Sequence, residues 1–186
     1  MSEEQSIPDV MIVMMNPGYN NPKNPQEEFQ EGIIEIIPDI TLKAIISLME
    51  DDQVQQKYSM NWCRIINLSD YEHPNIDKFI QKFDYYCDIY DDTHSLFSDE
   101  RKQEFDEIFL VSPSSIVILA WGNNPQMADL RTKAYETVQD KIKQYNNKVF
   151  GWFFQPDEKH QKLCWRYSYQ RAFKQYNYQA QKCKKY

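Results

Sequence analysis

An apolar run that stops abruptly in a turn constrains the fold of this chain more than any other segment. Residues 10–15, Val-Met-Ile-Val-Met-Met, have the length of a β-strand and no polar side chain to face solvent, which is typical of a central strand in a parallel sheet covered on both sides. Asn16, Pro17 and Gly18 follow directly. Ligands of such sheets bind beyond the carboxyl ends of the strands. We therefore expect Asn16 at a functional edge, with Pro17 fixing the backbone and Gly18 allowing close approach by another backbone or a ligand.

Apolar runs alternate with helix-like segments along the rest of the chain. We expect strands at 9–15, 62–68, 115–121 and 148–154. We expect helices over 38–49, 75–87, 99–110, 125–145 and 160–178, with Ser98 capping the third. Strands that alternate with helices form βαβ units with right-handed crossovers. The sequence therefore predicts a single three-layer α/β/α domain, 1–186, around a four-stranded parallel sheet, with a long polar loop at 19–37 of the kind that often serves as a lid or binding loop.

Composition narrows the class of protein. A length of 186 residues with 41% hydrophobic content is enough for one domain with a proper core. No segment approaches the roughly 18 consecutive apolar residues that span a bilayer. The acidic start Met-Ser-Glu-Glu is the opposite of a secretory leader. These features predict a cytoplasmic protein without a membrane partner.

Cysteine and histidine spacing argues against a metal centre. The four cysteines, at 63, 87, 164 and 183, form no Cys-x-x-Cys pair. Four such thiols could ligate a metal or an iron–sulfur cluster, but long irregular intervals favour ordinary reduced cysteines. The histidines at 73, 94 and 160 form no His-Glu-x-x-His motif. We expect neither a metal nor another cofactor.

Charge is distributed unevenly. The segment 159–186 contains eight Lys or Arg and no Asp or Glu, so it carries +8, and the rest of the chain then carries −15. Aromatic residues lie between these cations, a mixture that suits phosphate neutralisation and base stacking. We expect DNA-backbone contacts from Lys159, His160, Lys162 and Arg166. The alternative is an amphipathic terminal helix whose aromatics pack on the sheet while its cations face water, and the two interpretations are compatible.

Each predicted strand ends in polar or turn-forming residues. The endings are Asn16-Pro17-Gly18, Asn67-Leu68-Ser69-Asp70, Trp121-Gly122-Asn123-Asn124-Pro125 and Gln155-Pro156-Asp157. In a parallel sheet all four line one edge. They would form a crevice with amides, a carboxylate, an indole and tight turns, but without a strong general base or an obvious nucleophile.

These endings resemble the motifs of a known family. A strand followed by Asn-Pro-Gly resembles the first motif of the uracil-DNA glycosylase superfamily, especially its mismatch-specific branch, where a strand ends in Gly-x-Asn-Pro-Gly. The motifs Asn-Pro-x, Val-Asn-Leu, Ala-Trp-Gly and His-Pro of a small bacterial family associated with the same fold are also similar. Their counterparts here are Asn16-Pro17-Gly18, Ile66-Asn67-Leu68, Ala120-Trp121-Gly122 and Gln155-Pro156. They occur in the same order over about residues 9–157, and four motifs in order are more specific than one turn.

The resemblance implies a metal-independent DNA glycosylase. It implies that Asn16 positions water against the anomeric carbon of a flipped nucleotide and that Gln155 donates to the leaving base where the family uses His or Asn. The substrate site would then comprise Pro17, Gly18, Tyr19, Asn67, Asp70, Trp121, Gly122 and Asn123.

Two positions depart from the family pattern. Met14 stands where the family has a glycine, which changes the floor of the pocket. No clear Leu wedge follows Gln155, so Tyr19 or an aromatic residue of the segment 159–186 would have to extrude the base. A modified base, such as a phage-modified cytosine, then becomes the expected substrate, in a monomer that acts on DNA.

Other interpretations of the same residues remain open. Asn16 can cap the strand end through local backbone, Asn67 can orient the first loop, and Trp121 is more typical of packing than of stacking on a base. Asp70 and His73 could form an acid/base pair for phosphoester hydrolysis, although such residues more often cap the following helix. The whole chain could accordingly be a nucleotide or nucleoside hydrolase, or a non-catalytic nucleic-acid-binding module.

Overall fold

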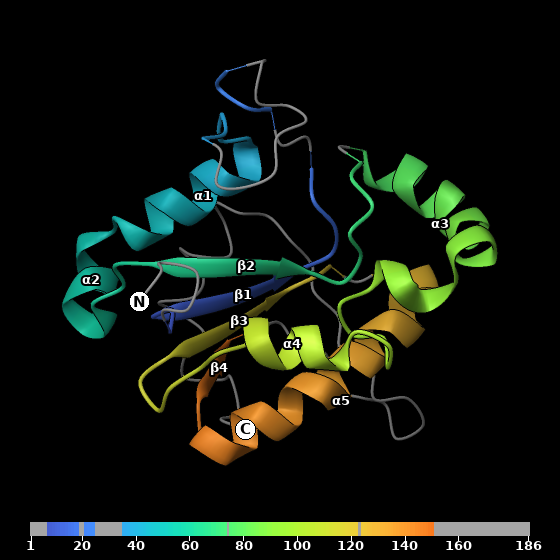
Figure 1. The fold of residues 1–186 in the computed structure, drawn as a ribbon. Helices are drawn as coiled ribbons and strands as arrows, with labels where there is room; N and C mark the ends of the chain where they lie inside the picture. Colours follow the sequence, from blue (N-terminus) through green and yellow to red (C-terminus); the bar gives the residue numbers. More distant parts are fainter. Residues whose placement is uncertain (1–6, 19–20, 25–34, 74, 123, 151–186) are drawn as a thin grey trace.

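The chain folds around a four-stranded parallel sheet. The computed structural model describes residues 7–18, 21–24, 35–73, 75–122 and 124–150 (Figure 1). The strands are β1 (Val10–Met14), β2 (Cys63–Asn67), β3 (Ile116–Ala120) and β4 (Lys148–Phe150). They lie in the order β2-β1-β3-β4, and every pair is parallel. The prediction of an α/β fold with a four-stranded parallel sheet is confirmed.

The apolar run at the start of the chain forms a central strand. Val10 pairs in register with Cys63 on one side and Ile116 on the other. Val10, Met11, Ile12 and Val13 are each exposed by 2% or less. A strand with neighbours on both sides and layers on both faces has no solvated surface, which explains the continuous hydrophobicity of its sequence.

Helices connect the strands and follow the predicted segments closely. They are α1 (Ile40–Met49), α2 (Asp52–Tyr58), α3 (Ile76–Tyr90), α4 (Lys102–Ile108) and α5 (Ala128–Tyr145). Two 3₁₀ turns, η3 (Asp91–His94) and η4 (Pro125–Met127), precede α4 and α5 respectively. None of the helices in the described part of the chain is long and apolar enough to cross a membrane.

Two details of the helices differ from the sequence-based expectation. Helix α2 was not predicted, because Val54 is its one buried residue and an apolar stripe is missing. It is held by its N-cap Asp51, which accepts hydrogen bonds from the backbone of Gln53 and Val54 at 3.0 Å. The prediction that Ser98 caps α4 is wrong. Ser98 belongs to a preceding turn, with its N–H donating to the Ser95 carbonyl at 3.0 Å, and α4 begins after Arg101.

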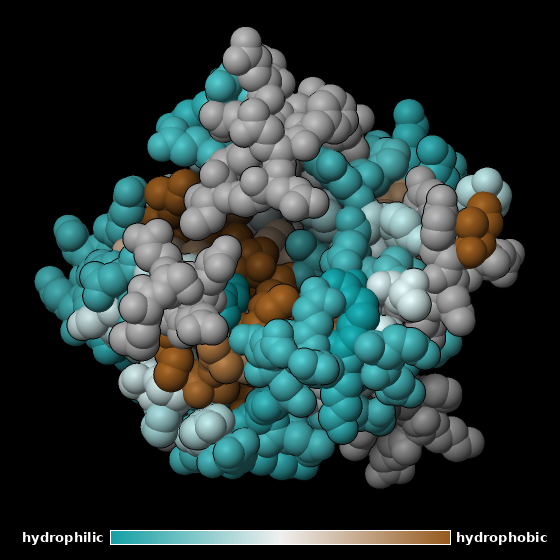
Figure 2. Space-filling model, in the orientation of Figure 1, coloured by the Kyte–Doolittle hydropathy of each residue, from teal (hydrophilic) through white to brown (hydrophobic). Residues whose placement is uncertain are grey.

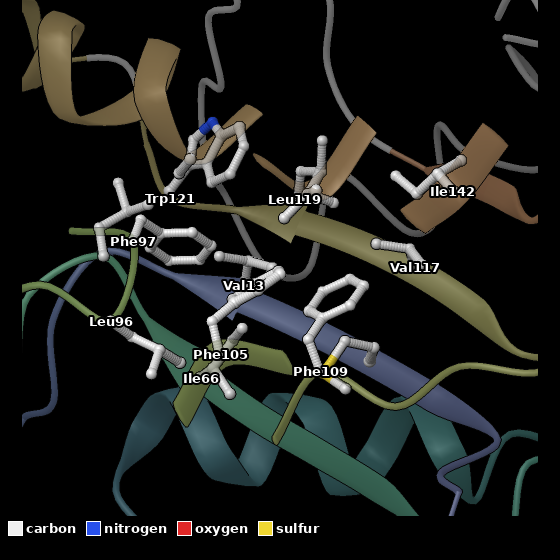
Figure 3. Packing of buried hydrophobic residues seen from close by; sticks show 14 of the residues in the cluster. Val13, Ile66, Leu96, Phe97, Phe105, Phe109, Val117, Leu119, Trp121 and Ile142 are labelled. Carbon is white, nitrogen blue, oxygen red and sulfur yellow. The ribbon is translucent and has the colours of Figure 1, made fainter. Parts of the chain in front are cut away.

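The helices lie on both faces of the sheet and form three layers. One face carries a cluster built from Met11, Val13, Val117 and Leu119 with residues of α4 and α5, and Figure 3 shows its aromatic and aliphatic side chains meeting over the strands. The other face carries alternate residues of the same strands, packed against α1 and α2. Strand alternation thus divides the core into an α5-side layer and an α1-side layer.

Among the described residues, those on the two faces of the sheet are not equally buried. Ile118 and Phe150, on the α1 side of β3 and β4, are only partly buried. Figure 2 shows a mostly hydrophilic surface with apolar side chains gathered in a hollow near the centre of this view. The last four residues of the predicted strand 148–154, the predicted helix 160–178 and the basic segment 159–186 lie outside the described residues.

The strand order fixes where a crevice can open. The connection from β1 to β2 passes through α1 and α2 on one face, while the connection from β3 to β4 passes through α5 on the other. Because β1 and β3 are neighbours, the chain leaves their carboxyl ends toward opposite faces. Ligand sites of open parallel sheets are found at such a switch point.

Candidate functional site

The carboxyl ends of β1, β2 and β3 bring the predicted motifs together. Met14, the last residue of β1, pairs with Asn67 of β2 and with Ala120 of β3. The ladder continues past the strands, since the N–H groups of Leu68 and Ser69 donate to the carbonyls of Met14 and Met15 at 2.8 and 3.0 Å. The segments that follow β1 and β2 therefore run beside each other at this edge (Figure 1).

The side chain of Asn16 joins these two segments. Its Nδ2 donates to the backbone carbonyls of Pro17, His73 and Tyr71 at 2.9, 3.0 and 3.3 Å. The His73 N–H in turn donates to the Pro17 carbonyl at 3.1 Å. Because all three partners of the amide are acceptors, they determine which end of it is nitrogen. Asn16 is thus held in one orientation, and its Oδ1 is the atom left to accept a hydrogen bond from a ligand or water.

A row of partly buried side chains lies next to Asn16. Asn67, Met14 and Ala120 are in register across three strands and point to the α1 side of the sheet, like the other residues of their parity. Each of the three is partly exposed. The row offers one amide at its β2 end followed by two apolar groups, a pattern suited to the edge and face of a planar ligand.

Gly18 makes a close contact that the sequence did not identify. A Cβ at this position would lie 2.9 Å from Oδ2 of Asp39. Asp39 is also the N-cap of α1, with Oδ1 accepting from the Leu42 N–H at 2.8 Å. A carboxylate therefore sits against the turn that follows β1. The signal for the cap was present in the sequence, as an Asp before an apolar helix, but its position against Gly18 depends on the path of the intervening loop.

Asp70, predicted as a substrate contact, is part of an ion-pair network. Its carboxylate pairs with Arg101, which also binds Glu104 through two hydrogen bonds of 2.7 Å. Hydrogen bonding to Glu104 and then to Asp70 raises the pKa of the guanidinium, and the same Arg101 hydrogen bond lowers the pKa of Glu104. Arg101 therefore neutralises Asp70 and ties the loop after β2 to the start of α4.

The loop after β2 is reinforced by a buried serine and histidine. Ser69 is fully buried, and its hydroxyl lies 3.1 Å from Nδ1 of His94. The His94 ring stacks on Tyr71 with centroids 4.9 Å apart and meets the edge of Phe83. A serine beside a histidine resembles a nucleophile and its base, but complete burial leaves this hydroxyl without access to a substrate. The pair instead stiffens the loop that Asn16 holds.

The alternative acid/base pair of Asp70 and His73 finds little support in the geometry. Asp70 is engaged by Arg101. The Nδ1 atom of His73 accepts from the Asn75 N–H at 3.0 Å, while Asn75 Oδ1 accepts from Lys78 N–H at the start of α3. His73 thus organises the backbone before α3, as the capping interpretation expected, whereas Asp70 pairs with a side chain and is not shown capping a helix.

Trp121 and Gly122 follow β3 and have structural roles in this structure. Trp121 is completely buried in the α5-side cluster (Figure 3). It packs there and does not face a crevice. Gly122 has φ of +70°, a conformation that favours glycine, and a Cβ added there would lie 2.9 Å from Cε of Met15. Gly122 therefore shapes the edge through its backbone.

Other predicted site residues lie outside the described part of the chain. These are Tyr19, Asn123, Gln155, Lys159, His160, Lys162 and Arg166. Among the residues that are described, no group of three or more His, Cys, Asp or Glu is arranged to hold a metal ion. Cys63 is a free thiol, and burial raises its pKa.

Comparison with known proteins adds no relative to this description. No family model matches the sequence, and neither a curated protein nor a solved structure is significantly similar. The residues at the sheet edge are therefore the main indication of function. They provide an oriented amide, a row with a second amide, and a carboxylate against the first turn. Such a set can bind a polar planar ligand and position water.

Proposed function

We propose that this chain is a DNA glycosylase of the uracil-DNA glycosylase type that hydrolyses the bond between a flipped base and its sugar. The observation that supports this most strongly is the Asn16 amide, oriented by three carbonyl acceptors at the end of the central strand. An amide so held presents Oδ1 at a fixed position without any rearrangement during the reaction. Fixed polar groups of this kind are usually the largest source of catalysis when charge develops in the transition state.

The proposed reaction needs little from the protein beyond positioning and electrostatics. Oδ1 of Asn16 accepts a hydrogen bond from a water molecule and holds it against C1′ of the extruded nucleotide. The C1′–N bond breaks with its electron pair going to the base, the water oxygen forms the new bond to C1′, and one proton of the water ends on the released base or in solvent. The sugar passes through an oxocarbenium-like state, as in other glycoside hydrolysis. The products are a free base and an abasic site.

The row beside Asn16 supports a base as the ligand. The Asn67 amide can bond the polar edge of a base, while Met14 and Ala120 supply apolar contact for its ring. Met14 occupies the position where the resembled branch has a glycine, so this floor differs from a uracil pocket. We therefore propose that the substrate is a modified base in DNA, with phage-modified cytosine as the leading candidate. The enzyme would act as a cytoplasmic monomer in defence against phage.

Base release can be tested directly. Wild type, Asn16→Ala and the control Asn61→Ala are incubated with DNA containing uracil, mismatched thymine, or hydroxymethylated or glucosylated cytosine, and abasic sites are revealed by alkaline cleavage. Asn61 is exposed, and its side chain donates to the nearby Ser59 carbonyl before β2, at the opposite end of the sheet; its backbone N–H, which bonds Asp9, is kept in the alanine variant. We expect cleavage with wild type and Asn61→Ala, and a loss of at least ~100-fold with Asn16→Ala.

Other results would assign a different function. Binding of DNA with steep salt dependence but no abasic sites on any substrate would indicate a binding module. Release of base from free nucleosides or nucleotides but not from DNA would indicate a small-molecule hydrolase of the same fold. Equal activity of wild type and Asn16→Ala would remove Asn16 from the mechanism.

A further inference from the structure

We propose that Asp39 is a catalytic carboxylate of this site, facing the cationic sugar and accepting the proton of the attacking water. The inference rests on the proposed glycosylase function and adds the charged group that an amide cannot supply. It depends on where α1 begins relative to the turn after β1. Because α1 begins directly after Asp39, the carboxylate of Asp39 contacts Gly18.

The two oxygens of Asp39 have different surroundings. Oδ1 caps α1 by accepting from the Leu42 N–H at 2.8 Å. Oδ2 lies over Gly18, so near that a methyl group there would stand 2.9 Å from it. An N-cap needs one acceptor oxygen. The second oxygen is therefore available at the turn, two residues after Asn16, and a glycine at position 18 leaves room for it.

The remaining polar groups of the strand ends are poorly suited to this task. The Asn16 amide is neutral and does not take up a proton. Asp70 is neutralised by Arg101, and Glu72 is exposed. His73 uses Nδ1 to accept from the Asn75 N–H. Among the described carboxylates at this edge, Asp39 alone is both partly buried and outside any described ion pair.

The carboxylate completes a balanced reaction. Water attacks C1′ while the C1′–N bond breaks and its electron pair leaves with the base. One proton of the water passes to Oδ2 of Asp39, which later returns it to the departed base or to solvent. Before that transfer, the negative charge of Asp39 stabilises the positive charge that develops on the sugar. Asn16 positions the water, and Asp39 supplies the charge.

Other ionisable groups lie on α1 and on the segments that lead to it or flank the first turn. Lys43 lies one turn further along α1. Lys23 and Glu35 form an exposed ion pair of 2.7 Å on the segment that leads to α1, and the pairing lowers the pKa of Glu35. His73 lies in the loop that is bonded to Asn16 and Pro17. A matched control must leave these groups unchanged.

Asp39→Asn separates catalysis from capping. Asparagine caps helices about as well as aspartate, so the variant keeps the start of α1 and removes only the charge. Asp51→Asn is the control, because Asp51 caps α2 in the same way but is exposed and distant from the turn in sequence. Asp39→Ser is a second variant that retains a capping oxygen. Rates of base release, thermal unfolding and DNA affinity are measured for all four proteins.

We expect Asp39→Asn and Asp39→Ser to lower kcat by about 100-fold or more, while unfolding temperature and DNA affinity stay near those of wild type and Asp51→Asn remains fully active. KM for the DNA should stay near the wild-type value in both variants, because Asp39 acts on the water and the sugar in the transition state and not on binding of the ground state.

The outcomes that oppose the inference are distinct from failure of the function itself. Wild-type kcat in Asp39→Asn, or a raised KM with an unchanged kcat, would overturn the role of Asp39 while leaving a glycosylase that depends on Asn16. Absence of base release by wild type would overturn both proposals together.

Discussion

The two faces of the sheet differ most at the carboxyl ends of the same three strands. On the α5 side, Leu68, Leu119 and Trp121 are completely buried. On the α1 side, Asn67, Met14 and Ala120 are partly exposed. Successive side chains along a strand point to opposite faces. One residue of a neighbouring pair is therefore buried in the core, while the other belongs to the partly exposed row beside Asn16. The difference teaches that a single strand end can support the fold and present a site at once.

The largest expected effect comes from truncating one side chain on each face of the sheet and comparing the losses of stability. Trp121→Ala should lower the free energy of unfolding by about 3–5 kcal/mol, as expected for a buried aromatic that leaves a cavity. Met14→Ala should lower it by only about 1 kcal/mol, since solvent already reaches Met14. Urea denaturation monitored by circular dichroism gives both values. Equal losses would mean that the two faces are equally packed.

A second test asks whether Asn16 also supports the structure. Asn16→Ala should lower the free energy of unfolding by about 1–3 kcal/mol, because the carbonyls of Tyr71 and His73 lose their donor. Asn16→Asp should be less stable still at pH 7, since a carboxylate would face those carbonyls and cannot donate. Thermal unfolding beside Asn61→Ala measures this order. An Asp variant as stable as wild type would show that the amide is not held by its nitrogen.

The smallest expected effect concerns the ion pairs that brace the α5 side. Arg101 holds the pKa of Glu104 below its ordinary 4.5 through a side-chain hydrogen bond. A lowered pKa means that the stabilisation is fully present above pH 4.5 and is lost as pH falls through the folded-state pKa. Because Glu104 is 44% exposed, solvent screening limits the contribution to about 0.5 kcal/mol.

Glu104→Gln should therefore unfold slightly more easily than wild type at pH 7 and equally easily at strongly acidic pH. Parallel urea titrations at the two pH values compare them, with Glu107→Gln, a residue on the same short helix α4, as the control. A difference that grows as pH falls would contradict the assigned direction.

Local sequence patterns predicted much of the fold for clear physical reasons. The run from Val10 to Met15 is typical of a doubly covered strand, and polar residues after the apolar runs marked the carboxyl edge. The prediction of a long helix over 125–145 also agrees with η4 followed by α5. Helix α2 escaped detection because it depends on a cap and one apolar contact, at Val54, and not on a periodic stripe.

Site geometry depended on contacts between distant segments. The pairing of Asp70 with Arg101 and the contact of Asp39 with Gly18 join residues that no local pattern connects. The indole of Trp121 lies in the core because Trp121 directly follows β3 and its side chain lies on the α5 side. Parity along a strand could have suggested this, since Val117 and Leu119 are buried on the same face.

The central place of β1 has a consequence for synthesis of the chain. Val10 is made before both of its partners, Cys63 and Ile116, so the strand cannot be enclosed until Ile116 has left the ribosome. At 5–20 residues per second, about 100 further residues take roughly 5–20 s. For that time an apolar strand stays unpaired, open to chaperones and to wrong partners. The central strand β1 is thus unpaired until both of its neighbouring strands have been synthesised.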